Sequence, residues 1–142
     1  MPFLPGNAPN IEYVDPPNPG VGADFAFVFS KTVPVKVHSM LILLNTSAVA
    51  GNRMPTLSIV NAIGGNHYFE VGLTAAVAAN AICPMVFSTA YTQVQAMTLG
   101  GLAGYGAPLP DLWIPPGGAL SMFTTNLDVS DFWNDIHAMV ES

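Results

Sequence analysis

The sequence predicts an all-β protein, an antiparallel, jelly-roll-like β-sandwich with an extended proline-rich N-terminal arm. Three observations support this prediction. Apolar and polar residues alternate in about eight short segments, Gly, Pro and Asn turns separate these segments, and no long segment has a convincing helical period. With 142 residues, the chain has room for one ordinary domain. We therefore divide it into an arm, residues 1–22, and a sandwich domain, residues 23–142.

The arm holds six of the thirteen prolines. Proline fixes φ and lacks a backbone N–H, so we expect this segment to be extended, similar to polyproline II, and without a regular β-ladder. Its apolar side chains Phe3, Leu4, Ile11 and Tyr13 are our candidates for docking onto a partner. The alternative is a terminus without fixed contacts, which is common in proteins.

The sandwich begins at residues 23–30, where three phenylalanines alternate with smaller residues. A second apolar strand runs through residues 33–44 into an Asn-Thr-Ser turn. Residues 56–63 and 67–73 predict two further strands, and the Gly-Gly-Asn sequence at 64–66 predicts a hairpin loop between them.

The middle of the chain is rich in alanine and glycine. Residues 74–80 favour a helix by composition but lie between strands, so we expect a loop or a short helix there. Residues 85–91 and 93–99 predict strands, and the glycine-rich residues 100–106 predict a flexible loop.

In the C-terminal third, residues 112–114 predict a short strand that Pro115 ends, and residues 119–125 predict another strand. The polar residues 126–131 are typical of a hairpin connection. Residues 129–140 fit both a helical stripe and one face of a strand. We favour a strand, because Asp, Asn, Trp, Phe, Ile and Val are mediocre helix formers.

Charged residues are scarce: only 8% of the chain is charged, 51% is hydrophobic, and no charged residue lies between Glu70 and Asp111. About a quarter of the residues of an ordinary domain are charged, and that ionic surface keeps free monomers unassociated. We therefore expect other subunits to cover much of this surface. The sequence predicts a component of an assembly that associates with itself.

Other partners and locations are disfavoured. The net charge of −6 would repel nucleic acid. The apolar run 71–87 contains Thr74, Asn80 and Pro84 and is too weak for a membrane span. The N-terminus lacks the features of a signal peptide, so we expect the protein to remain where it is made until it is assembled.

We find no pattern typical of a catalytic, cofactor-binding or metal-binding site, and we predict neither an enzyme nor a cofactor. His67 and Glu70 are three residues apart and would point to opposite sides of a strand. Asp131 and Asp135 could share a face with His137, but a solvated acidic edge explains them more simply.

Two further motifs also lack a catalytic pattern. The segment Gly101–Gly106 lacks the Lys and Ser/Thr of a phosphate-binding loop. Cys83 lies in an apolar run, where a buried thiol is the simplest interpretation.

Tyr105 and Trp113 are further candidate interface residues, because aromatic side chains with a polar group suit protein interfaces.

The C-terminal third resembles the closing hairpin of small jelly-roll virion proteins of tailed bacteriophages. The resemblance rests on an apolar strand, a Pro-Gly corner, a second strand, a turn with Asp and a last strand that ends in Glu (residues 112–122, Asn126-Leu127, Asp131-Phe132-Trp133, Ile136 and Val140-Glu141). It implies a capsid decoration, or cement, protein: a homotrimer made in the host cytoplasm that binds across major capsid protein subunits on the virion surface. The chain departs from that group in its alanine-rich middle and in lacking an adhesion motif.

Two other functions stay open at this point. One is a tail or head-fibre module that binds a receptor or carbohydrate, which a loop cluster with exposed Trp113, Tyr105 and His67 would favour. The other is an oligomeric enzyme with cupin-like architecture, whose metal would need clustered His and carboxylate ligands.

Overall fold

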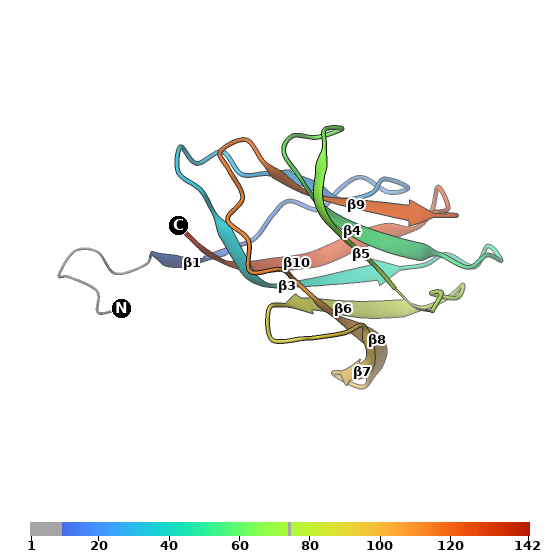
Figure 1. Cartoon of the computed structure of the whole chain (residues 1–142). Coiled ribbons are helices and arrows are strands. Elements are labelled where there is room, and N and C mark those ends of the chain that lie inside the picture. The colour runs from blue at the N-terminus through green and yellow to red at the C-terminus, as the bar shows by residue number, and fades with distance from the viewer. Residues whose placement is uncertain (1–9, 74) are drawn as a thin grey trace.

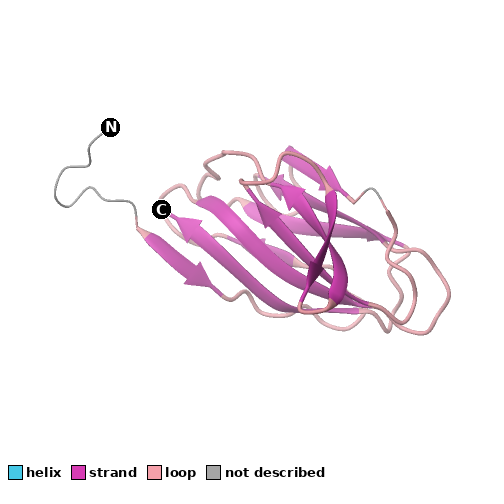
Figure 2. Cartoon of the chain, turned by 90° about the horizontal axis from the view of Figure 1, so that it is seen from below, coloured by secondary structure: helices cyan, strands magenta, loops and turns pink. Residues whose placement is uncertain are grey.

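The computed structural model describes residues 10–73 and 75–142, and these fold into ten strands in two facing sheets, with no helix among them (Figures 1 and 2). The first sheet has six strands in the order β1-β10-β3-β6-β8-β7, and the second has four in the order β2-β9-β4-β5. The predicted all-β sandwich is therefore confirmed. The strands are β1 (Ile11–Val14), β2 (Ala26–Val28), β3 (Lys36–Asn45), β4 (Met54–Val60), β5 (His67–Gly72), β6 (Ile82–Ser88), β7 (Gln95–Leu99), β8 (Leu102–Pro108), β9 (Ala119–Thr125) and β10 (Phe132–Glu141).

The topology is that of a jelly roll with one added hairpin. Without β7 and β8, the sheets have the orders β1-β10-β3-β6 and β2-β9-β4-β5, in which most connections cross from one sheet to the other. The hairpin β7–β8 extends the first sheet beyond β6. Pairing is antiparallel except between β6 and β8, because the chain passes from β6 to the outermost strand β7 and returns through β8 in the same direction as β6.

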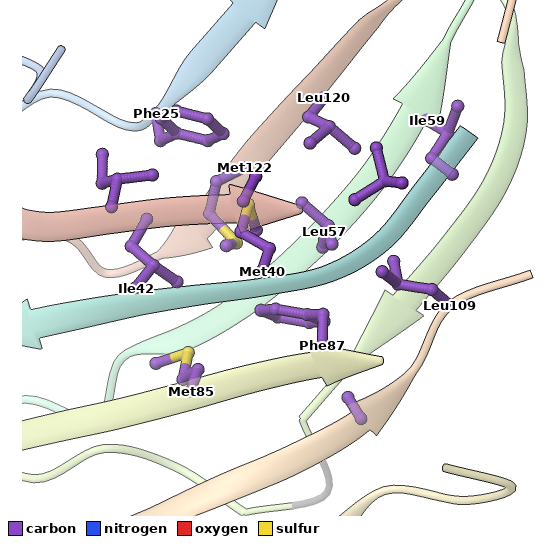
Figure 3. Close-up of a cluster of buried hydrophobic side chains, with 14 of the residues drawn as sticks. Phe25, Met40, Ile42, Leu57, Ile59, Met85, Phe87, Leu109, Leu120 and Met122 are labelled. Atoms are coloured by element: carbon purple, nitrogen blue, oxygen red, sulfur yellow. The ribbon is translucent and has the colours of Figure 1, made fainter. Parts of the chain in front are cut away.

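The core lies between the two sheets and is formed by side chains at alternate strand positions. Figure 3 shows Met40 and Ile42 of β3 with Met85 and Phe87 of β6, facing side chains of the other sheet. Fully buried side chains such as these each contribute roughly 1.5–3 kcal/mol by leaving water. The predicted alternation is confirmed in β9, where Leu120, Met122 and Thr124 are buried. The side chains from the second sheet and its flanking segments that Figure 3 labels are Phe25, Leu57, Ile59, Leu120 and Met122.

The expectation that residues 1–22 form no ladder is wrong for Ile11–Val14. These residues form β1 and pair with β10, from Ile11 opposite Glu141 to Val14 opposite Ala138. The prolines of this region flank the strand and leave its four N–H groups intact. Phe3 and Leu4 lie outside the described residues, and an arm there stays a prediction.

The predicted flexible loop at residues 100–106 is also wrong. Only Gly100 and Gly101, with φ of 58° and 81°, form a turn, and β8 begins at Leu102. A Cβ on Gly104 would collide with the carbonyl oxygen of Pro84, and a Cβ on Gly106 would lie 3.0 Å from the ring of Tyr91. These two glycines therefore permit close packing inside a sheet, which the sequence alone does not distinguish from flexibility.

The segments around β9 differ from prediction in two ways. Residues 112–114 form no strand, and only Ile114 makes a single bridge, to Val35. Residues 126–131 are no hairpin, because they connect β9 of one sheet to β10 of the other. The predicted loop is confirmed at residues 75–80.

The predicted strand at the C-terminus is confirmed as β10. A bulge between Asn134 and His137, with Asp135 at φ 49°, shifts the alternation by one residue. Trp133 and Ile136 both face the core as a result. Their spacing of three explains why the sequence also fitted a helical stripe.

Candidate interaction surfaces

Arg53 and Asp131 form a buried ion pair between the loop after β3 and the loop before β10. Arg53 Nε donates to Asp131 Oδ2 at 2.8 Å, and Nη2 donates to Oδ1 at 3.1 Å. Arg53 Nη1 also donates to the carbonyl oxygens of Val49 and Gly51 at 2.9 and 2.7 Å. The pair therefore holds together loops that connect the two sheets, at the right-hand end of Figure 1.

Both groups of this pair stay charged. Burial by itself would raise the pKa of Asp131, but hydrogen bonds from Arg53 and from the N–H groups of Ser47 and Asp128 outweigh it and lower the pKa. The hydrogen bond to Asp131 raises the pKa of Arg53. The prediction that Asp131 lies on a solvated edge is wrong, and its saturated hydrogen bonding indicates a structural role.

The histidines lie beside carboxylates rather than in clusters. His67 Nδ1 lies 2.5 Å from Glu70 Oε1, although a regular strand would separate them. A bulge in β5 places Val60 opposite His67 and Ile59 opposite Phe69, so the side chains of His67 and Glu70 share a face. His137 lies 2.7 Å from Asp15 and therefore does not pair with Asp131.

Within residues 10–73 and 75–142, no three His, Cys, Asp or Glu side chains gather in a way that could hold a metal ion. Every buried side-chain N or O atom in this part of the chain has a hydrogen-bond partner. The described residues also contain no helix with the length and hydropathy of a membrane span. The candidate functional sites of the described residues are therefore surfaces rather than buried clusters of titratable side chains.

The outer face of the six-stranded sheet carries apolar side chains on its central strands. On β3, Met40 and Ile42 face the core, whereas Leu41 and Leu43 point outward and are half-buried. Val86 of β6 points outward opposite Leu41. We call Leu41, Leu43 and Val86 the Leu41 stripe. A sheet face that meets water is normally polar, so this pattern is typical of strands covered on both faces.

Two predicted interface residues lie on the same outer face. Tyr13 is 83% exposed and opposite Met139 of β10, and Ile11 is 54% exposed and opposite Glu141. Trp113 is near this face. Lys36 lies opposite Glu141 in the register of β3 and β10, and its Nζ is 4.8 Å from the centroid of the Trp113 ring.

Lys36 also contacts Asp111 at 2.7 Å. The hydrogen bond to Asp111 raises the pKa of Lys36, and the same bond lowers the pKa of Asp111. This part of the face is therefore polar and already paired within the chain.

Tyr105 lies elsewhere, on the inner side of β8. It lines a hollow of about 440 Å³ between the loop after β5 and the hairpin β7–β8, together with Cys83, Met97 and several alanines. β7 and β8, which line one side of the hollow, are the two strands by which the six-stranded sheet is wider than the four-stranded one. Cys83 is 4% exposed, which confirms the prediction of a buried thiol, and this burial raises its pKa to about 11.

The outer face of the four-stranded sheet carries a second hollow, of about 470 Å³, that sequence reasoning missed. Its lining includes Phe123 of β9, hydroxyl side chains of β4 and β9, and the pair His67–Glu70 of β5. The signal was present in the sequence, since the predicted alternation placed Phe123 beside Ser121 and Thr125 on the polar face of the strand.

The structure therefore separates the residues on which a receptor-binding module would depend. Tyr105 lines one hollow, His67 lines another, and Trp113 lies beside Lys36.

Comparisons with protein-family models, curated proteins and solved structures gave no match for this chain.

Proposed function

We propose that this protein is a non-enzymatic structural component of a virion, a capsid decoration protein that stabilises the shell by binding across capsid subunits. The observation that carries the proposal is the Leu41 stripe on an uncovered sheet face. Apolar outward residues at the centre of β3 and β6, in a chain with 8% charged residues, favour a protein whose outer surface is covered by other subunits.

The composition of this face suits an interface whose binding free energy comes from the apolar area that it buries. Obligate interfaces bury a few thousand Å² of largely apolar surface. No charged residue lies between Glu70 and Asp111, so β6, β7 and β8 offer no charge that a partner must desolvate. Repetition over a shell strengthens binding further, because each linked contact makes the next one effectively intramolecular.

Sedimentation of the full chain tests this proposal. Alone, the protein should sediment as an oligomer, and mixed with tailed-phage shells that lack decoration proteins it should pellet at a fixed ratio to the major capsid protein. A stable monomer at high concentration that ignores such shells would overturn the proposal.

A pair of variants locates the contact. Val86→Lys places a charge in the Leu41 stripe and should abolish both association and shell binding. The matched control is Thr125→Lys, at an exposed position of the other outer face, and it should leave both unchanged. Circular dichroism should show that both variants remain folded.

A further inference from the structure

The hollow on the four-stranded sheet has a defined order of side chains. Ser58 of β4 lies opposite Ser121 of β9 on one side and opposite Glu70 of β5 on the other. The next outward row has Thr56 between Phe123 and Gly72. Rows on one face are about 6.6 Å apart, twice the rise per residue. A row of two hydroxyls and a carboxylate therefore lies beside a row with one large aromatic ring.

Phe123 dominates its row because its neighbours are small. Its side chain is 67% exposed, while Gly72 has no side chain and Thr56 is short. Phe123 lines the hollow together with the hydroxyl-bearing residues Thr56 and Ser121. An aromatic ring has a negative face and attracts the slightly positive C–H groups of a ligand that stacks on it.

The opposite wall of the hollow is polar. Ser58 Oγ donates to Glu70 Oε1 at 3.3 Å, and His67 Nδ1 lies 2.5 Å from the same oxygen. Both contacts use Oε1, so Oε2 can accept a hydrogen bond from a ligand hydroxyl. The hydroxyl groups of Thr56 and Ser121 can both donate and accept. All these partners suit an uncharged ligand with many hydroxyl groups.

From this geometry we propose that the hollow is a binding site for a neutral saccharide. A sugar ring presents an apolar C–H face, which stacks on Phe123, and a rim of hydroxyls, which Ser121, Thr56 and Glu70 bind. Ser58 is buried and donates its proton to Glu70, so it positions this carboxylate. The volume of about 470 Å³ lies within the range of small-molecule sites. The carboxylate of Glu70 and the net charge of −6 disfavour acidic sugars. The site lies on the face away from the Leu41 stripe, so an assembled protein can still display it.

Saturation-transfer NMR and calorimetry on the full chain, without capsids, test the proposal. The probes are the methyl glycosides of glucose, galactose, mannose and N-acetylglucosamine, with N-acetylneuraminic acid as the acidic comparison. We expect at least one neutral glycoside to bind with a dissociation constant in the millimolar range or tighter, and the acidic sugar not to bind. No binding by any neutral glycoside, or equal binding of the acidic sugar, would overturn the proposal.

Variants then assign the site. Phe123→Ala should weaken binding at least tenfold, and Phe123→Tyr should restore it, because the ring is what the sugar contacts. Tyr13→Ala removes an exposed aromatic ring from the other sheet and is the matched control. Equal loss in Tyr13→Ala, or unchanged binding in Phe123→Ala, would contradict the assignment. Since no shell is present, these results are independent of the sedimentation experiments on the decoration function.

Discussion

The two sheets of this sandwich share one core but differ in their outer faces. On the six-stranded sheet, the outward positions of the central strands carry Leu41, Leu43 and Val86. On the four-stranded sheet, the corresponding central positions carry Thr56, Ser58 and Ser121, with the exposed ring of Phe123 opposite Thr56. β3 pairs with β6, and β4 pairs with β9, without a bulge at these positions, so the difference is one of side-chain chemistry.

The difference teaches where this protein can form contacts and of which kind. An apolar outer face gains free energy only when another surface removes it from water, about 25 cal/mol per Å². A face of hydroxyl groups gains little from such burial and instead offers directional hydrogen bonds. We therefore assign assembly to the first face and ligand recognition to the second. The predictions below test this division, beginning with the largest expected effect.

Arg53→Ala should destabilise the whole sandwich, and with it both outer faces, since it removes the charge that compensates buried Asp131. Breaking a buried ion pair costs about 3–5 kcal/mol, and urea denaturation should measure it as a fall in the free energy of unfolding. Lys31→Ala is the control, because Lys31 pairs with Glu12 at the surface, where such pairs contribute about 0–1 kcal/mol. Equal effects of the two variants would contradict the structural role of Arg53.

Replacing Leu41 and Leu43 by threonine gives the six-stranded sheet the outer chemistry of the other face. Self-association should weaken at least tenfold, about 1.4 kcal/mol, because the stripe loses apolar area. Analytical ultracentrifugation over a range of concentrations measures this change. The reciprocal variant, Ser121→Leu, should not weaken association; if it does so as strongly as the threonine variant, the two faces do not have separate roles.

Acid should destabilise the frame that both faces share. The pKa of Asp131 is lower in the folded protein than its unfolded value of about 3.9, so its contribution to stability is present above about pH 4 and is lost as the pH falls through the folded-state pKa. Thermal unfolding between pH 7 and pH 2.5 should show this loss. Asp131→Asn should lack that part of the pH dependence, and an identical slope in both proteins would refute the assignment.

The last prediction concerns a reaction rate rather than stability or association, and it tests the side of β6 on which a thiol lies. Cys83 faces inward, is 4% exposed and has a pKa of about 11, so at pH 8 it should react with iodoacetamide ~100-fold more slowly than a free thiol of pKa 8.5. Ile82→Cys in a Cys83→Ala background places the thiol one residue away, on the exposed side, and should react quickly. Comparable rates would mean that the inward and outward positions of β6 are assigned wrongly.

The sequence predicted the sandwich and the short, alternating strands, because period-two alternation is a local property. It also made Ile11 and Tyr13 candidates for docking onto a partner, and that stays a prediction. Both side chains are exposed and lie on the same outer face as the Leu41 stripe. It did not predict β8, because a glycine such as Gly104 is equally consistent with a flexible loop and with a strand that packs closely against Pro84. The hollow beside Phe123 depends on which strands are neighbours, and the sequence does not state that.

The amino-acid sequence by itself determined the fold class, the inward positions of regularly alternating strands such as β9, and the scarcity of charge, since these follow from composition and local alternation. Only the tertiary structure decided that Arg53 meets Asp131 across 78 positions of the chain, and that Ser121, Ser58 and Glu70 form one row. Strand order and bulges determine such meetings. Each depends on the packing of segments distant in sequence, which no local pattern records.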